Sequence, residues 1–324
     1  MPLFFRKRKP ADVDEPWKDH ASVSRETGAQ PRRAASLGNV DVDDEYGEEI
    51  APTEATRPEY PRPTSPRVFV VANQKGGVGK TTTTVNLAHA LALGGLNVLV
   101  VDNDPQGNAS TALGVAHTPG TKGTYEVLLE GVGIIEHAQP SPHSPNLHVL
   151  PAAIDLAAAE LELVNMRGRE HRMRDAIQQY VEESGVDYIF FDCPPSLGLL
   201  TLNALVAANE ILVPIQTEYY ALEGVTQLMR TIQRVKGNLN DDLELSTILL
   251  TMYDSRTNLS REVADEVRKH FPQQTLTQEI PRSVRIAEAP SFQQTVLTYQ
   301  PRSPGAVAYF AAAKEMAERA KVSE

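Results

Sequence analysis

Apolar runs of strand length recur along this chain, and segments with the apolar spacing of helices lie between or after them. The apolar runs cover residues 67–72, 97–101, 147–150, 187–192, 210–215 and 245–252. The helical segments cover residues 81–93, 155–183, 198–208, 221–236, 259–270 and 304–319. Strands that alternate with helices of this size predict an α/β fold, a three-layer sandwich whose mostly parallel, twisted sheet is flanked by helices. Ligands of such folds bind at the carboxyl ends of the strands.

The first 66 residues do not share this periodicity. They are rich in proline, arginine and acidic residues, with an acidic block at residues 41–49 and prolines at positions 61, 63 and 66. This composition predicts a disordered N-terminal extension and Pro-rich linker at residues 1–66, followed by a folded domain at residues 67–324. The extension begins with an apolar segment, residues 3–5, ahead of four basic residues. Two interpretations stay open: a solubilising tail, or an arm that binds a further protein, nucleic acid or an anionic membrane surface.

The strongest chemical signal lies between the first predicted strand and the first predicted helix. The sequence there is Lys75-Gly76-Gly77-Val78-Gly79-Lys80-Thr81. A glycine-rich turn between a strand and a helix is typical of a phosphate-binding loop, because backbone N–H groups and the helix N-terminus surround the phosphate oxygens. In this interpretation Lys80 binds the β- and γ-phosphates and Thr81 binds Mg²⁺.

This loop departs from the standard pattern G-x-x-x-x-G-K-[ST]. Gln74 occupies the position of the first glycine, and a second lysine, Lys75, opens the loop instead. A lysine at the mouth of the loop is able to reach a nucleotide in a facing subunit. ATP would then form part of a dimer interface.

Acidic side chains stand at the ends of two further predicted strands. Asp102 and Asp104 come directly after the apolar run that ends at residue 101, where carboxylates can position a water molecule or hold Mg²⁺ indirectly. Asp192 ends another hydrophobic run, which is the Walker-B arrangement for holding Mg²⁺ through water. The single cysteine, Cys193, is interpreted as a buried apolar residue rather than a nucleophile.

A third segment, Ile280–Ser291, follows a late short strand. Pro281 is suited to pack on a flat purine ring, and the arginines of this segment are suited to phosphates. By chemistry alone, a solvated loop fits the segment equally well.

Composition narrows the classes of function. The formal net charge of -11 excludes a basic field over the whole surface, so any contact with DNA must be a local patch. One cysteine excludes an internal disulfide framework and a metal or iron–sulfur site built from several cysteines of one chain. The chain has no apolar run long enough for a transmembrane helix, and its first apolar segment is too short for a signal peptide. We therefore expect a cytoplasmic protein.

Taken together, these motifs resemble those of ParA/Soj-type partition ATPases of the deviant Walker A class, which also contains MinD. The resemblance covers residues 67–321 and is carried by residues 73–82, Asp102–Gly107 and Ile280–Ser291. Residues 251–258 also resemble the segment after the penultimate strand of that family. The resemblance implies a P-loop ATPase domain at residues 67–324, with ATP and Mg²⁺ as cofactors.

The resemblance also implies roles for single residues. Lys75 matches the signature lysine that contacts ATP across the dimer, Lys80 the lysine on the bound phosphates, and Asp104 the acid needed for hydrolysis. Thr81, Asp104 and Asp192 match the Mg²⁺ site, the acids acting through water. The implied nucleotide-binding residues are Lys75, Gly76, Gly77, Val78, Gly79, Lys80, Thr81, Thr82, Met252, Pro281, Arg282, Ser283 and Val284, the last five on the adenine side.

Arg256 and Arg285 match basic residues tied to DNA binding in such proteins. An exposed arginine that caps a nearby helix is the alternative for each. Because non-specific duplex binding requires only a row of phosphate contacts, the acidic net charge does not exclude it.

The function implied by the resemblance is an ATP-dependent dimerising switch. The ATP-bound homodimer binds double-stranded DNA without sequence preference and drives chromosome or plasmid segregation with a ParB-type centromere-binding partner. Hydrolysis of ATP to ADP and phosphate is slow by itself, is stimulated by the partner, and resets the switch. The expected location is the cytoplasm, in association with the nucleoid.

The main alternative is a MinD-like membrane-associated positioning ATPase. That group ends in an amphipathic basic helix, whereas residues 311–321 are rich in alanine and carry few bulky apolar side chains. An iron-protein reductase is disfavoured by the single cysteine, and an amidoligase or kinase by the lack of a visible acceptor-substrate motif. Residues 1–66 show no helix-turn-helix periodicity, which disfavours a repressor that binds its own operator.

Overall fold

The computed structural model describes residues 59–219 and 221–320, so the predicted extension up to residue 58 lies outside the described residues. Within them the strands form one eight-stranded sheet in the order β3-β4-β2-β5-β1-β6-β7-β8. β3 is antiparallel to β4, and the other neighbouring pairs are parallel. The strands are β1 (Arg67–Val71), β2 (Val98–Asp102), β3 (Gln139–Pro140), β4 (Leu147–Leu150), β5 (Tyr188–Asp192), β6 (Glu210–Gln216), β7 (Glu244–Tyr253) and β8 (Thr275–Pro281).

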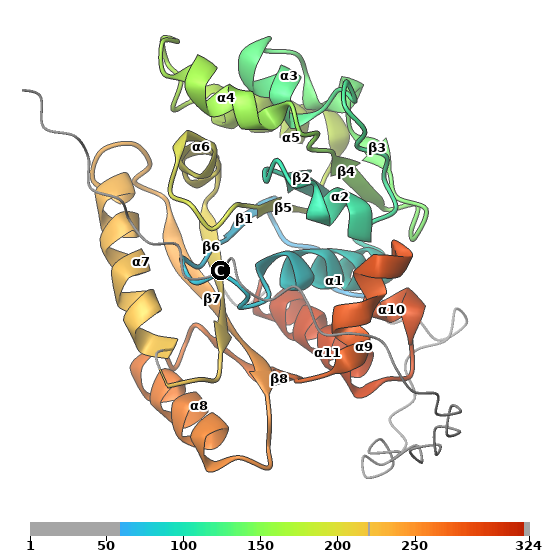
Figure 1. Ribbon diagram of the computed structural model, residues 1–324, viewed down its shortest axis with the longest axis vertical. Helices are drawn as coiled ribbons and strands as arrows, with labels where there is room; N and C mark the ends of the chain where they lie inside the picture. Colours follow the sequence, from blue (N-terminus) through green and yellow to red (C-terminus); the bar gives the residue numbers. More distant parts are fainter. Residues whose placement is uncertain (1–58, 220, 321–324) are drawn as a thin grey trace, which may run out of the picture. The chain divides into compact units, whose positions relative to one another are not determined.

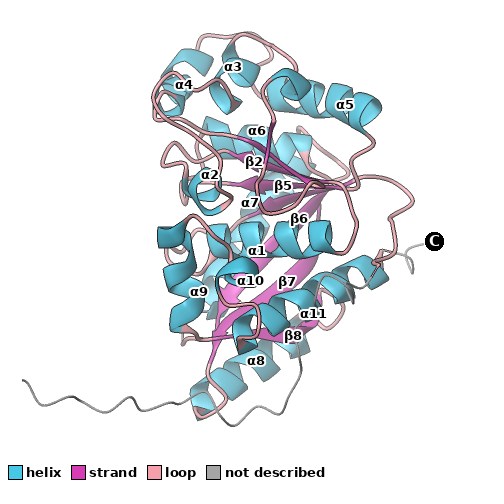
Figure 2. Cartoon of the chain, turned by 90° about the vertical axis from the view of Figure 1, so that its right-hand side faces the viewer, coloured by secondary structure: helices cyan, strands magenta, loops and turns pink. Residues whose placement is uncertain are grey.

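Helices cover both faces of this sheet (Figures 1 and 2). One face carries α1 (Lys80–Leu93), α2 (Asn108–Ala112), α9 (Val284–Glu288), η3 (Ala289–Phe292), α10 (Val296–Tyr299) and α11 (Pro304–Arg319). The other carries α3 (Thr124–Leu129), η2 (Ile134–Glu136), α4 (Leu156–Leu163), α5 (Arg172–Ser184), α6 (Leu199–Ala207), α7 (Ala221–Lys236) and α8 (Asn258–His270). Among the described helices, none combines the length and the apolar character that crossing a membrane requires.

The two faces of the sheet have separate hydrophobic cores. In β1, Val68 and Val70 belong to one core, and Phe69 and Val71 belong to the other, because successive strand residues point to opposite faces. A strand that is buried on both sides needs apolar residues at every position. This is why the parallel strands read as continuous apolar runs in the sequence.

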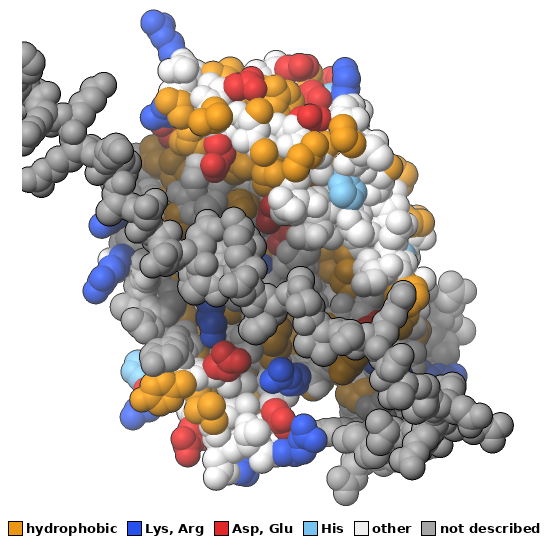
Figure 3. Space-filling view, in the orientation of Figure 1, with side chains coloured by type: hydrophobic (Ala, Val, Ile, Leu, Met, Phe, Trp, Pro, Cys, Tyr) orange, Lys and Arg blue, Asp and Glu red, His pale blue; other side chains and the backbone are white. Residues whose placement is uncertain are grey.

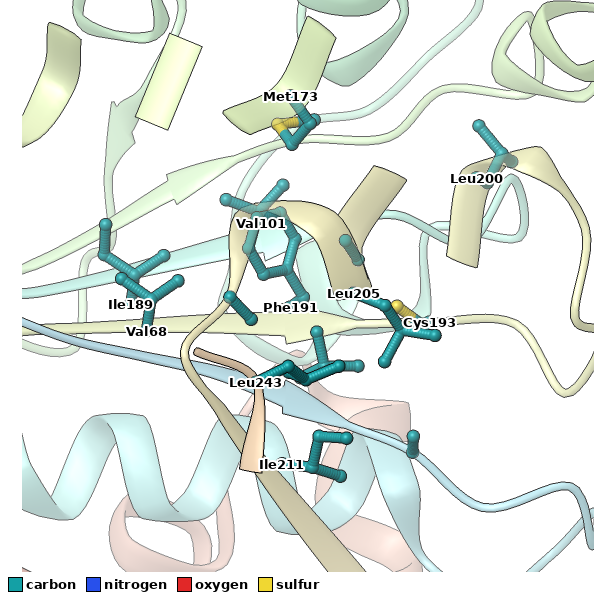
Figure 4. Packing of buried hydrophobic residues seen from close by; sticks show 14 of the residues in the cluster. Val68, Val101, Met173, Ile189, Phe191, Cys193, Leu200, Leu205, Ile211 and Leu243 are labelled. Carbon is teal, nitrogen blue, oxygen red and sulfur yellow. The ribbon is translucent and has the colours of Figure 1, made fainter. Parts of the chain in front are cut away.

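Figure 4 shows part of the core beneath α5 and α6. Met173 of α5 and Leu205 of α6 lie around Phe191 of β5, and all three are almost fully buried. Cys193 lies in the same core and is buried, and burial raises the pKa of its thiol strongly. Its environment is that of a small apolar residue, as the sequence predicts.

The predicted fold class is confirmed, and each predicted strand is found within one residue of its expected bounds. The prediction of a single helix over residues 155–183 is wrong. α4 ends at Leu163 and α5 begins at Arg172, and the chain turns between them at Gly168, whose φ of 64° is in the left-handed region. A glycine adopts this conformation without the strain that other residues would carry, so it permits the turn between the two helices.

Residues 59–66 pack on the domain, although the predicted linker includes them. The backbone N–H of Tyr60 donates to the Gly94 carbonyl at 2.9 Å, and its buried ring leaves no room for a side chain at Gly94. The Tyr60 hydroxyl donates to the Phe310 carbonyl at 3.0 Å. Arg62 pairs with Asp187 at 2.5 Å. These contacts fasten the chain to α1 and α11 ahead of residue 67, whereas the division of the whole chain at residues 66/67 stays a prediction.

Candidate nucleotide-binding site

The glycine-rich loop joins the end of β1 to the start of α1. Gly77 and Gly79 have φ values of 75° and 89°, and Gly79 is the residue that caps the N-terminus of α1. Side chains at these two positions would be strained, which explains the glycines in physical terms. Lys80 and Thr81 are the first residues of the helix. The loop therefore combines free backbone N–H groups with a helix N-terminus, as a phosphate site requires.

Lys80 is buried at the base of this loop. Its Nζ atom lies 3.5 Å from the Lys75 carbonyl oxygen. Burial lowers the pKa of Lys80, and the nearby carboxylates of Asp192 and Asp104 oppose that effect. The ammonium group thus lies among acids at the point where phosphate oxygens are expected, so an anionic ligand there would compensate its desolvation.

Two aspartates stand side by side at the ends of β2 and β5. Asp102 and Asp192 are paired in the register of these parallel strands, and both are fully buried. Asp102 accepts hydrogen bonds from the backbone N–H of Ser110 at 2.8 Å and from its hydroxyl at 2.7 Å. Burial and the mutual repulsion of the two carboxyl groups raise the pKa of Asp192, and burial raises the pKa of Asp102.

Asp192 has one carboxylate oxygen that the protein leaves without a partner. Its Oδ1 accepts a 3.4 Å hydrogen bond from the Thr84 hydroxyl, whereas the buried Oδ2 has no hydrogen-bond partner. The Thr81 hydroxyl lies beside this carboxyl group and opposes the rise of its pKa. An unpartnered buried carboxylate oxygen next to a hydroxyl fits a magnesium ion, which binds oxygen ligands and keeps several waters.

Asp104 lies in the turn after β2 and is half-exposed, unlike Asp102. Its Oδ1 accepts a hydrogen bond from the Gln106 N–H at 3.0 Å, and its carbonyl accepts one from Gly107 at 2.9 Å. Gly107 has a φ of 65°, and a side chain there would lie 2.9 Å from the Ala152 carbonyl oxygen. The turn is therefore held in one shape, with the Asp104 carboxylate at the solvent-facing side of the site.

The predicted adenine side lies at the carboxyl ends of β7 and β8. The Thr251 hydroxyl donates to the Val78 carbonyl at 2.9 Å, which joins the end of β7 to the phosphate loop. Arg282 N–H donates to the Tyr253 carbonyl at 3.0 Å, which joins the segment after β8 to the same place. Met252 has a φ of 52°, a strained conformation for a residue with a long side chain.

These contacts place the end of β7 against the phosphate loop and the segment after β8 against the end of β7, and contact of Met252 and residues 281–284 with a nucleotide stays a prediction.

The two arginines predicted to bind DNA each pair with an acid of their own segment. Arg256 forms two 2.9 Å hydrogen bonds to Asp254 and lowers the pKa of that carboxyl group to about 2, while 75% of its side chain stays exposed. Arg285 pairs with Glu288 of α9 at 3.2 Å and is 51% exposed. Neither pairing prevents contact with a phosphate, because both guanidinium groups remain accessible to solvent.

Further basic residues lie on the neighbouring helices. On the face shown in Figure 3, lysine and arginine side chains lie over α7, and basic and acidic side chains lie together in the region of α8. The basic residues of these two helices are Arg230, Arg234, Lys236, Arg261, Arg268 and Lys269. The surface is thus mixed in charge, and a DNA contact would use single arginines and lysines.

The sequence indicates Asp102 as a strand-end carboxylate beside Asp104 but gives it no separate role, and it does not indicate Glu218. Asp102 becomes a site residue through the pairing of β2 with β5, and the shared feature of an aspartate at both strand ends is a signal for it. Glu218 follows β6 and forms a 2.9 Å ion pair with Lys75, 143 positions earlier in the chain. Nothing local to either residue indicates that contact.

Known proteins are similar to this chain in sequence and in fold. An AAA domain family model matches residues 66–245. The chain is 47% identical over 253 residues to the chromosome partitioning protein ParA of Caulobacter vibrioides, a match that covers 78% of this chain and 94% of that protein. It is 49% identical over 253 residues to ParA of Myxococcus xanthus, covering 78% of this chain and 88% of that one. The chain belongs to the ParA/Soj family. Another member, the sporulation initiation inhibitor protein Soj of Bacillus subtilis, is 47% identical over 251 residues, covering 78% of this chain and 98% of Soj.

Solved structures agree with the ParA/Soj assignment at the level of the fold. A cobyrinic acid a,c-diamide synthase from Mycobacterium smegmatis, solved with bound ADP and magnesium, has a TM-score of 0.68 and 38% identity, covering 80% of this chain and 97% of that one. The cell division ATPase MinD of Pyrococcus furiosus has a TM-score of 0.64 and 26% identity, covering 78% and 99%. Because these two carry different names, the higher identity of the ParA and Soj relatives decides the family.

Ionisation of the buried Asp192 carboxyl group lowers the free energy of unfolding, and this effect can be measured. Since its folded pKa is raised, the folded state binds this proton more tightly than the unfolded state, and the free energy of unfolding falls as the pH rises from the unfolded pKa towards the folded value of about 8. Asp192→Asn should therefore raise the unfolding free energy of the nucleotide-free, magnesium-free protein by about 1–3 kcal/mol at pH 8, and by less at pH 5. Urea unfolding at both pH values measures this, and lower stability of the variant at pH 8 would contradict it.

Proposed function

We propose that this chain is an ATP-dependent dimerising switch that binds DNA non-specifically and acts in chromosome or plasmid segregation with a ParB-type partner. One observation supports it most: a phosphate loop opened by Lys75 lies beside a buried carboxylate with an unpartnered oxygen, in a chain of the ParA/Soj family. The proposed location is the cytoplasm, in association with the nucleoid.

The proposed reaction is in-line attack of water on the γ-phosphorus of ATP, which yields ADP and phosphate. Lys80 and the backbone N–H groups of the loop bind the phosphates, and Asp104 orients the attacking water. Thr81 would bind Mg²⁺ directly, and Asp104 and Asp192 through water; when bound, the ion neutralises charge that develops on the phosphate oxygens. Lys75 contacts the nucleotide of the second subunit.

The remaining loop and strand-end residues hold the nucleotide itself. Gly76, Gly77, Val78 and Gly79 bind the phosphates through their backbone, and Thr82 lies near the α-phosphate. Met252 and residues 281–284 line the adenine side, in keeping with the contacts that join the end of β7 to the loop and the segment after β8 to the end of β7.

The oligomeric state with different nucleotides tests this proposal. Sedimentation velocity should show a monomer without nucleotide or with ADP, and a dimer with ATP and Mg²⁺. ATP turnover should be slow alone and rise when a ParB-type partner and DNA are added. A monomer under all three nucleotide conditions would contradict the proposed switch.

Arg285 provides a test of the proposed DNA contact. Arg285→Glu should weaken duplex binding about tenfold and lower the salt dependence of binding by roughly two phosphate contacts per dimer, because each subunit loses one. Fluorescence anisotropy with a labelled duplex at several salt concentrations measures both effects. Arg174→Glu makes the same change of charge on α5 and serves as the matched control. Unchanged DNA affinity in the Arg285 variant would contradict a DNA contact by this residue and would leave it with a structural role only.

A MinD-like membrane switch is the second candidate, since the fold resembles MinD. Its surface-binding element would be an amphipathic terminal helix. The apolar side of α11, which includes Tyr309 and Met316, is buried in the core shared with α1 and β8. It would have to leave that core to enter a lipid surface. Flotation with anionic vesicles in the presence of ATP tests this candidate directly.

A further inference from the structure

The Lys75 side chain turns back onto its own chain. Its Nζ atom lies 2.9 Å from Oε2 of Glu218, and the other carboxylate oxygen of Glu218 accepts a hydrogen bond from the Gln216 side-chain amide. Both oxygens of Glu218 are therefore occupied by groups of the same subunit. The lysine is paired at the mouth of the loop, where a second subunit would approach.

Both ends of this ion pair are attached to the framework of the site. The Lys75 N–H donates to the Asn73 side chain at 3.0 Å, and the Asn73 amide donates to the Pro214 carbonyl at 2.9 Å. The Glu218 carbonyl accepts from the Ala221 N–H at 3.0 Å, at the start of α7. The backbone of each residue is thus hydrogen-bonded to its surroundings, and the ion pair itself is formed by two partly exposed side chains.

We propose that Glu218 is an intramolecular latch, which holds Lys75 in the nucleotide-free subunit and must release it before Lys75 contacts the nucleotide of a second subunit. This inference rests on the proposed function, because it concerns a competing partner for the cross-subunit lysine. While Lys75 is paired with Glu218, its side chain does not extend from the loop towards a second subunit. The Glu218 carboxylate also places a negative charge at the loop mouth, where it repels the phosphates of an approaching nucleotide.

The exposure of the two side chains determines how strong this latch is. Lys75 is 41% exposed and Glu218 is 48% exposed, so water and salt screen their attraction. Pairs of this kind shift an equilibrium by roughly twofold to fivefold. Because each subunit of a dimer must release one lysine, the effect on the dimerisation constant is the square, roughly four- to twenty-five-fold. Such a latch sets a threshold for dimerisation without preventing it.

Glu218→Gln tests the latch, since it removes the charge and keeps the shape of the side chain. With a non-hydrolysable ATP analogue and Mg²⁺ at low salt, the variant should dimerise roughly four- to twenty-five-fold more tightly than the natural chain, measured by sedimentation. The gain should shrink at high salt. Glu182→Gln, which removes one exposed charge from α5, should leave dimerisation unchanged. Equal or weaker dimerisation of the Glu218 variant would overturn the latch.

A second measurement separates failure of the latch from failure of the proposed function. Acetylation of Lys75 in the nucleotide-free subunit, followed by mass spectrometry, needs no dimer. Its rate should rise roughly twofold to fivefold in Glu218→Gln, because the ammonium group is no longer held by the carboxylate. An unchanged rate counts against the latch, whereas absence of a dimer of the natural chain at every ATP concentration counts against the proposed switch.

Discussion

Lys75→Ala is expected to abolish ATP-driven dimerisation while nucleotide binding by the single subunit stays within about tenfold of the natural chain. The physical reason is the position of this side chain. In the proposed function, Lys80, Thr81 and the glycines bind the phosphates of their own subunit, whereas the half-exposed Lys75 ammonium stands at the mouth of the loop and pairs with Glu218. Sedimentation with ATP and Mg²⁺, together with titration of a fluorescent ATP analogue, measures both properties.

Lys80→Ala is the matched control for this experiment. It removes the same charge from the base of the loop, where the side chain is buried, and should therefore abolish nucleotide binding itself. The contrast between the two lysines is the decisive result. Dimerisation that persists in the Lys75 variant would remove the cross-subunit role of Lys75 and, with it, the reason for a latch.

Asp104→Ala should lower ATP turnover at least about a hundredfold while the ATP-bound dimer still forms and stays on DNA. Its carboxylate is the half-exposed acid of the site, and within its turn it accepts a hydrogen bond from Gln106. The fold should tolerate the change, since Gly107 and the backbone hold the turn. Phosphate release and dissociation of the dimer from labelled DNA measure the two effects.

Asp104→Asn tests whether ATP turnover requires the negative charge of the Asp104 side chain or only its shape. Asparagine can still accept the hydrogen bond from Gln106, so the turn keeps its form, but the side chain is no longer an anion that orients water. Both variants should be inactive and remain bound to DNA. Turnover in Asp104→Asn close to that of the natural chain would show that the carboxylate is not needed.

Features that depend only on residues close together in the chain could be predicted from the sequence. The strands were predictable because both their faces are buried, which makes each one a continuous apolar run. The phosphate loop was predictable because strand, glycines, Lys80 and Thr81 are adjacent in the chain. The break between α4 and α5 was missed because apolar spacing continues across Gly168, and the short helices α2, α3, α9 and α10 contain too few residues for a period to appear.

Features that depend on strand order could not be predicted from the sequence. Asp102 lies beside Asp192 because β2 lies next to β5, and Lys75 meets Glu218 because β1 lies next to β6. Neither of these strand pairings follows from the order of the strands along the chain.

Binding to an unrelated DNA duplex with ATP, with ADP and without nucleotide, at low and moderate salt, tests the central claim most directly. The account predicts binding that requires ATP, weakens steeply with salt and does not depend on sequence, because two subunits joined by ATP double the number of phosphate contacts. Binding that is equal in all three nucleotide states, or absent from all of them, would contradict a nucleotide-gated DNA switch.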